Sequence, residues 1–247
     1  MGPLAQLEEG YCRTSYGYIF YRRLPSPGPK IIMLHGLGAD SRTWKKLIRY
    51  LPGGFDVYMP DLLGHGRSDA PDIDYQIGVQ VRVLGDFIAS AGIETPVLFG
   101  NSYGAWIAGL YAVADGTDCR GIVFEDSAGL EPFMEHLRDT GEEGRYRSWL
   151  LEGSLKICPN RPHVMSSIIN NSGVHTITAG TLARIRCPSL VIWGSNDTVL
   201  PSSLANWMCS EIPECKLSII DGADHIPHIS KPDVVGQLLS DFVSGLR

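Results

Sequence analysis

Short apolar segments alternate along the chain with segments whose apolar residues recur at helical spacing. The apolar segments are rich in β-branched and aromatic residues and are bounded by Gly, Pro, Asp or Asn, as strands buried on both faces of a sheet are. They cover residues 30–36, 56–61, 96–102, 121–127, 188–194 and 216–221. The helical spacing covers residues 75–91, 103–114, 203–211 and 232–246. The alternation predicts an α/β fold with a mostly parallel central sheet and helices on both of its faces.

Two segments depart from this alternation. Residues 11–24 surround a Ser-Tyr-Gly turn and predict an antiparallel hairpin. Residues 129–186 lose the rhythm of strand and helix, so we expect a core of residues 1–128 and 187–247 with a short helical lid insert at 129–186. Amphipathic pieces of the insert offer apolar side chains that we expect to contact substrate. These are Met134, Trp149 and Met165. The alternative is that they only pack the insert onto the sheet.

The composition is that of a globular protein without a basic surface. The chain has 247 residues, of which 44% are hydrophobic and 19% charged, and its net charge is −6. Lys and Arg are interspersed with acidic residues, which argues against a nucleic-acid partner. The first residues lack the pattern of a signal peptide, and no apolar run approaches the roughly 20 residues of a membrane span. We therefore expect a cytoplasmic protein with a small-molecule substrate and no membrane partner, and the oligomeric state stays open.

Six cysteines are scattered along the chain without a CxxC pair and without a histidine at metal-ligand spacing. We expect them to be reduced and mostly buried. Disulfides would fit an exported protein, but a core of this size does not require them. No metal site is expected.

The strongest chemical signal is the segment Gly-Asn-Ser-Tyr-Gly at residues 100–104, which follows an apolar strand and precedes a helical segment. A serine on a sharp turn from strand to helix needs small residues two positions before and after it, because neighbouring backbone passes too close for a Cβ. Ser102 would then project from the carboxyl edge of the sheet, above a helix N-terminus that favours developing negative charge. Ser102 is therefore the candidate nucleophile.

A serine hydroxyl is a weak nucleophile at neutral pH, so this interpretation requires a base and a group that orients the base. Asp197 follows one predicted strand and His225 follows the next, which brings both to the edge where Ser102 points. We assign His225 as general base and Asp197 as the orienting acid. Two rivals remain: His228, three residues beyond the assigned base, and Asp126, at the end of the strand after the nucleophile helix.

Acyl transfer also requires two N–H donors for the oxyanion that forms at the substrate carbonyl. The segment His-Gly-Leu-Gly at residues 35–38 directly follows a predicted strand. We assign the donors as the backbone N–H groups of Tyr103, the residue after the nucleophile, and of Leu37 in this loop. The side chain of His35 is interpreted as structural, holding the loop in place.

Together these motifs resemble the α/β-hydrolase superfamily over nearly the whole chain, in its serine hydrolase, carboxylesterase-like branch. The resemblance rests on five segments. These are HGLGADSRTW, PDLLGHGRSDAP, GNSYGA, VIWGSNDTVLP and GADHIPH. His65 and Arg67 correspond to structural residues of the family's loop after the second of its parallel strands.

The histidine loop departs from the family's usual Gly-His followed by Glu-x-Pro. Here Asp224 precedes His225, and Lys231 precedes Pro232. A carboxylate next to the base would favour the charged imidazole. The resting ionisation of the base is therefore open at this stage.

The resemblance implies a carboxylic ester hydrolase that forms an acyl-enzyme on small, mainly uncharged acyl substrates and uses neither metal nor organic cofactor. A serine nucleophile disfavours the haloalkane dehalogenase and epoxide hydrolase branches. The Gly-Asn-Ser start of the nucleophile turn is also typical of carbon–carbon bond hydrolases of ring-cleavage products, which are the first alternative. The second is a non-catalytic ligand receptor on the same fold.

Overall fold

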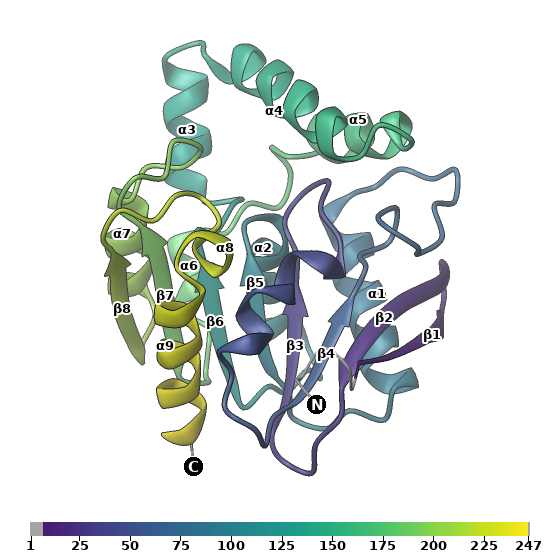
Figure 1. Ribbon diagram of the computed structural model, residues 1–247. Helices are drawn as coiled ribbons and strands as arrows, with labels where there is room; N and C mark the ends of the chain where they lie inside the picture. The colour runs from purple at the N-terminus through teal and green to yellow at the C-terminus, as the bar shows by residue number, and fades with distance from the viewer. Residues whose placement is uncertain (1–6, 247) are drawn as a thin grey trace.

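Eight strands form a single sheet at the centre of the computed structural model, which describes residues 7–246 (Figure 1). The strand order is β1-β2-β4-β3-β5-β6-β7-β8. From β4 to β8 all neighbours are parallel, whereas β2 is antiparallel to both β1 and β4. The strands are β1 (Glu8–Thr14), β2 (Gly17–Leu24), β3 (Lys30–Leu34), β4 (Asp56–Pro60), β5 (Val97–Asn101), β6 (Gly121–Glu125), β7 (Ser189–Gly194) and β8 (Cys215–Ile220).

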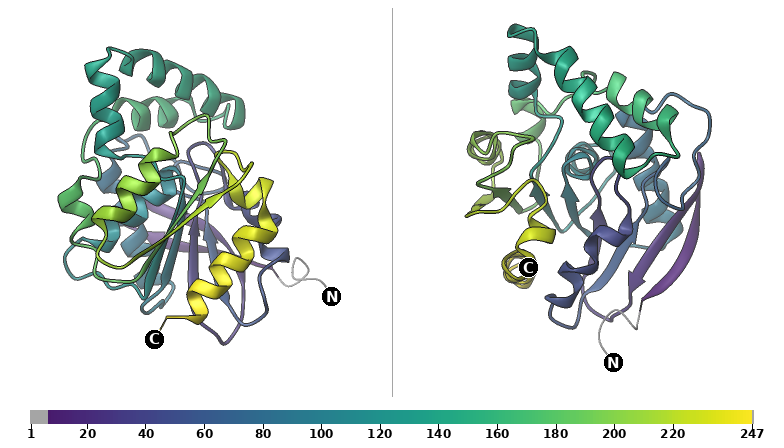
Figure 2. Two further views of the ribbon diagram at one scale, coloured as in Figure 1. Left: turned by 90° about the vertical axis from the view of Figure 1, so that its left-hand side faces the viewer. Right: turned by 45° about the horizontal axis from the view of Figure 1, so that its top comes forward.

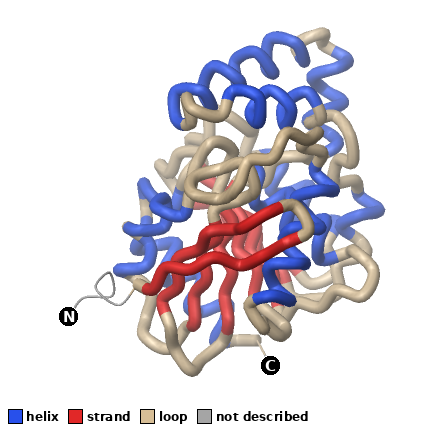
Figure 3. The backbone as a smooth tube through the Cα atoms, turned by 90° about the vertical axis from the view of Figure 1, so that its right-hand side faces the viewer, coloured by secondary structure: helices blue, strands red, loops and turns tan. Residues whose placement is uncertain are grey.

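Helices cover both faces of this sheet (Figure 3). One face packs against α1 (Ile77–Ser90), α2 (Tyr103–Ala112) and α7 (Ser203–Glu211), whose buried residues join one core cluster. The other face packs against α9 (Pro232–Ser244) and the 3-10 turns η2 (Ser41–Lys45) and η3 (Leu47–Arg49). Figure 2 shows α7 and α9 on opposite sides of the sheet. Because strands β3 to β7 are covered on both faces, nearly every residue in them is buried.

Three helices stand above the carboxyl ends of the parallel strands (Figures 1 and 2). They are α3 (Glu131–Asp139), α4 (Glu143–Ile157) and α5 (Pro162–Asn170), and we call them the cap helices. The chain returns to the core through the short helix α6 (Ala179–Leu182), and the short helix α8 (Pro227–Ser230) lies between β8 and α9. The cap helices all come from the segment that lacks the alternation of strand and helix.

The predicted fold class is confirmed, since every expected strand and helix is present. The first long helix begins at Ile77, two residues later than its apolar pattern. Tyr75, two residues before the helix, is buried in the core instead. Its backbone N–H donates to Ser167 Oγ of α5 at 2.8 Å. Residues 1–6 lie outside the described residues, and they are part of the segment in which we expect no signal peptide. Within residues 7–246 no helix is long and apolar enough to cross a membrane.

The cysteines correct one expectation. Cys209 and Cys215 form a disulfide that joins the end of α7 to the start of β8. Cys12, Cys119 and Cys158 are free, as is Cys187. The expectation of six reduced thiols was wrong because it rested on chain size and absent CxxC spacing. It took no account of the hairpin-like return of the chain between α7 and β8.

We predict that the denatured protein, purified without reductant, reacts with a thiol reagent at four cysteines, and at six after reduction. The measurement is a mass shift per alkylated thiol, with peptide mapping to locate the unreacted pair. Alkylation of all six thiols before reduction would contradict the disulfide.

Candidate active site

Ser102 occupies the sharp turn between β5 and α2. Its φ is +51°, a region that side chains other than glycine rarely adopt. A Cβ on Gly100 would lie 2.4 Å from the backbone N of Ala105, and one on Gly104 would lie 2.1 Å from the carbonyl O of Leu34. Both positions therefore require glycine. The N–H of Ser102 donates to the carbonyl O of Glu125 on β6 at 2.9 Å, which holds the strained turn in place.

A continuous hydrogen-bonded chain links Ser102, His225 and Asp197, which follow β5, β8 and β7. The Nε2 atom of His225 lies 3.0 Å from Ser102 Oγ, and its Nδ1 atom lies 2.8 Å from Asp197 Oδ2. The other oxygen of Asp197 accepts the backbone N–H groups of Val199 and Leu200 at 2.7 and 3.0 Å. The structure thus brings together the three residues that the sequence places at three separate strand ends.

The electrostatics of this chain favour an ionised Asp197. Its side chain is fully buried, and burial by itself raises the pKa of a carboxyl. The hydrogen bond from His225 and its electrostatic attraction, with the N–H of Leu200, outweigh this effect and hold the pKa of Asp197 below its usual value. In the neutral imidazole, the proton on Nδ1 then points at Asp197. The lone pair of Nε2 faces the Ser102 hydroxyl, which is the geometry that activates a serine.

The loop after β3 passes directly over Ser102. A Cβ on Gly36 would lie 2.9 Å from Asn101 Oδ1 and 3.5 Å from the Cβ of Ser102. Within residues 7–246, the backbone N–H groups of Leu37 and Tyr103 have no protein acceptor. Both N–H groups would therefore be free to donate hydrogen bonds to an oxyanion above Ser102.

His35 holds this loop from below. Its Nε2 atom accepts the N–H of Leu62 at 2.9 Å, and its Nδ1 atom lies 2.8 Å from the carbonyl O of Gly36. Complete burial lowers the pKa of His35, so the ring stays neutral and keeps one accepting nitrogen. The neighbouring His65 is also fully buried, which lowers its pKa to about 3. Both rings are buried in the loops that follow β3 and β4, and neither contacts Ser102.

The rival histidine, His228, does not contact Ser102. His228 is fully buried, with Nδ1 bonded to Glu125 Oε2 at 2.5 Å and Nε2 lying 2.7 Å from Thr43 Oγ1. The backbone N–H of His228 donates to the other carboxylate oxygen of Glu125 at 2.9 Å. Sequence analysis missed Glu125, although a charged residue in an otherwise apolar strand is a signal that a buried partner exists.

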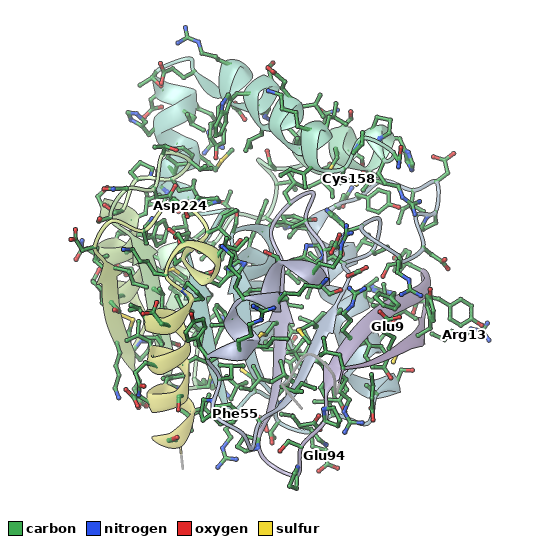
Figure 4. The ribbon with its side chains drawn as sticks, in the orientation of Figure 1. Glu9, Arg13, Phe55, Glu94, Cys158 and Asp224 are labelled. Carbon is green, nitrogen blue, oxygen red and sulfur yellow. A yellow bond between two sulfur atoms is a disulfide. The ribbon has the colours of Figure 1, made fainter. Side chains whose placement is uncertain are left out.

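The carboxylate of Asp224 makes its hydrogen bonds within its own turn and not to the imidazole of His225. Its Oδ1 atom accepts the N–H of Ile226 at 2.9 Å and the hydroxyl of Ser230 at 3.0 Å. This carboxylate therefore caps the turn that carries His225. In Figure 4 the label of Asp224 marks this loop, and the label of Cys158 marks the far end of α4 across the same edge of the sheet.

A cavity of about 310 Å³ opens from Ser102 toward the cap helices. Its lining includes Met134 of α3 and Trp149 of α4, two of the three apolar residues expected to contact substrate. Met165 corrects the third expectation, because it is absent from the lining and fully buried in the core cluster. Its helical face packs the cap onto the core. Within the described lining there is no Asp, Glu, Lys or Arg side chain.

Known proteins share both the sequence pattern and the fold. The curated relative monoacylglycerol lipase abhd6-A of Xenopus laevis is 28% identical over 277 residues, covering 95% of this chain and 82% of that protein. The solved structure of a membrane phospholipase A, described as a bacterial virulence factor, has a TM-score of 0.84 at 24% identity, covering 98% of this chain and 87% of the other. A putative lipase from Acinetobacter baumannii has a TM-score of 0.83 at 20% identity, covering 97% and 92%.

The family match extends over most of the chain. The sequence model of the alpha/beta hydrolase family matches residues 31–238, from the start of β3 into α9. This span includes the nucleophile turn, the cap helices and the loops that carry Asp197 and His225. The resemblance found in the sequence motifs is thereby confirmed, and the chain belongs to the α/β-hydrolase family.

Proposed function

We propose that this hydrolase cleaves carboxylic esters of small, mainly uncharged acyl groups, with Ser102 as nucleophile, His225 as general base and Asp197 as orienting acid. The observation that carries the proposal is the unbroken hydrogen-bonded chain from Asp197 to Ser102, which opens into an apolar cavity. The uncharged lining disfavours an ionised acyl group, whose burial without a partner costs free energy. The curated relative from Xenopus laevis is a monoacylglycerol lipase, which favours esters as the substrate class.

The reaction runs in two halves. Ser102 Oγ attacks the ester carbonyl while His225 Nε2 takes its proton, and the N–H groups of Leu37 and Tyr103 stabilise the oxyanion. The intermediate collapses, His225 gives the proton to the departing alcohol oxygen, and the acyl group remains on Ser102. Water then attacks the acyl-enzyme with His225 again as base, and the carboxylic acid leaves.

We predict that Asp197→Asn lowers kcat by about 10⁴-fold. The amide oxygen would keep the backbone N–H groups of Val199 and Leu200, so the amide NH2 group would face Nδ1 of His225 and hold the imidazole in the wrong tautomer. The measurement is steady-state kinetics on an ester substrate, with circular dichroism to show that the variant is folded. A larger loss in folded Asp126→Asn than in folded Asp197→Asn would transfer the role of orienting acid to Asp126.

The reaction class is tested with a panel of substrates. The panel contains short and long p-nitrophenyl esters, a monoacylglycerol, a lactone, an acyl thioester and a vinylogous ring-cleavage diketone, with Ser102→Ala as the matched control. We predict turnover of the short esters without added metal and its loss in the control, which cannot form an acyl-enzyme. The highest kcat/KM on the diketone would instead indicate a carbon–carbon bond hydrolase. Ligand binding without turnover in both proteins would indicate a receptor.

The cap helices are expected to select the acyl chain. Met134→Ala and Trp149→Ala remove side-chain atoms from the cavity lining and so enlarge the cavity. We predict that the ratio of kcat/KM for long acyl chains to kcat/KM for short ones rises by about 10-fold, which corresponds to the free energy of burying one to two methylene groups. Kinetics on a series of p-nitrophenyl esters measures this ratio. Met165→Leu, a volume-conserving change away from the cavity, is the control. An unchanged chain-length profile in both cap variants would leave them as packing residues.

A further inference from the structure

Asp126 is a buried carboxyl group that the proposed reaction does not use. It follows Glu125 at the end of β6 and is fully buried, with a φ of +46°. Its Oδ1 atom accepts the backbone N–H of Gly194 at 3.0 Å. Its Oδ2 atom is buried and accepts no hydrogen bond from the described residues.

Asp126 belongs to a crowded group of titratable side chains. Asp126, Asp197 and His225 each offer one ligand-type atom, and these atoms lie within 4.8 Å of one another. Asp197 already accepts from His225 and from the backbone N–H groups of Val199 and Leu200. Two ionised carboxylates at this separation would repel each other without a second cation to balance them. A single proton on Asp126 removes the repulsion and turns the unpartnered oxygen into a donor.

We infer that Asp126 is a protonated carboxylic acid that donates a hydrogen bond from Oδ2 to the carboxylate of Asp197, and that it acts as a positioning residue for the Ser102–His225–Asp197 chain. The positioning role of Asp126 rests on the proposed function of Asp197. The protonation of Asp126 does not, because it follows from the packing of the carboxyl groups alone.

Burial and the neighbouring carboxyl groups favour the protonated form of Asp126. Burial and then the charge of Glu125 raise the pKa of Asp126 to about 10, and Asp197 adds to the effect, while the N–H of Gly194 opposes it. The same contact with Asp126 helps to lower the pKa of Asp197. The other titratable groups near this cluster are His225, His228 (which pairs with Glu125) and Tyr146 of α4, whose pKa burial raises.

A neutral donor serves the orienting acid in two ways. It fixes the rotation of the Asp197 carboxylate, so that Oδ2 keeps facing His225 Nδ1 during the reaction. It also leaves only one negative charge between Asp126 and Asp197. An ionised Asp126 would over-stabilise the imidazolium of His225, which would then release its proton to the leaving alcohol less readily.

Infrared spectroscopy detects the proton directly. We expect the wild-type protein at pH 7 to show the carbonyl band of a protonated carboxylic acid that is absent from the spectrum of Asp126→Asn. The control is Asp233→Asn, at an exposed carboxylate in the first turn of α9, which should leave the band in place. The absence of a difference between wild type and Asp126→Asn would overturn the inference. So would a band that appears only after treatment with a chelator, because a cation would then occupy the cluster.

Unfolding as a function of pH gives a second readout that needs no activity. Between the pKa of an unfolded aspartate, about 3.9, and the pKa of about 10 in the folded protein, the folded state holds a proton that the unfolded state has released. The contribution of Asp126 to stability therefore falls as pH rises through this window. Asp126→Asn has no such dependence, so its Tm should rise relative to wild type from pH 4 to pH 8. A constant or falling difference would contradict a protonated Asp126.

Kinetics separate the positioning role from a purely structural one. Asparagine keeps the acceptor for Gly194 and supplies an N–H donor to Asp197, whereas alanine supplies neither. We expect Asp126→Ala to lose about 10-fold to 100-fold in kcat, as for loss of a hydrogen bond to a charged group, and to shift the acidic limb of the pH–rate profile upward. Asp126→Asn should retain most of the turnover and an unshifted limb. Equal losses in the two folded variants, or no loss in either, would overturn the positioning role.

If wild type turns over no ester at all, the proposed function fails, while the infrared and unfolding measurements still decide whether Asp126 is protonated. If esters are hydrolysed but the carboxylic acid band is missing, the proposed function stands and the inference about Asp126 fails. The two failures are therefore distinguishable.

Discussion

The carboxyl end of β6 is the point to which the rest of the site is attached. The carbonyl O of Glu125 accepts the N–H of Ser102, and both oxygens of its carboxylate accept N–H groups of His228. Glu125 is fully buried, and these N–H groups supply the hydrogen bonds that a buried carboxyl group requires. One residue therefore ties the nucleophile turn to the turn that carries His225. The next residue, Asp126, lies against Asp197. The relative positions of Ser102, His225 and Asp197 thus depend on two consecutive residues, the last residue of β6 and the one that follows it.

The site is electrically one-sided. The buried acidic groups lie at the ends of β6 and β7, and each accepts hydrogen bonds from the backbone or from histidine. On the other side, the cavity toward the cap helices is lined by residues without a carboxylate, ammonium or guanidinium group, as far as the described chain shows. Under the proposed function, an uncharged ester enters from this side without losing strong hydration. The N–H groups of Leu37 and Tyr103 would then stabilise the charge that develops at its carbonyl.

The parts of this arrangement that follow from local sequence were predictable. The parallel strands show as apolar runs, and Gly100 and Gly104 mark the turn at Ser102 because no larger residue fits there. Asp197 and His225 were found because parallel strands end at one edge. The pairing of Glu125 with His228 joins residues 103 apart, which no local pattern encodes. Likewise, the apolar pattern in the cap could not tell Met134, which lines the cavity, from Met165, which packs beneath it.

The most direct test of the account is covalent labelling with a fluorophosphonate, which reacts with a serine only when a base and an oxyanion site activate it. The labelled protein is digested and the modified peptide is located by mass spectrometry. The account predicts one equivalent of label on Ser102, and none in Ser102→Ala. Wild type that takes up no label, or label that is found on another residue and persists in Ser102→Ala, would contradict the assignment of Ser102 as the nucleophile.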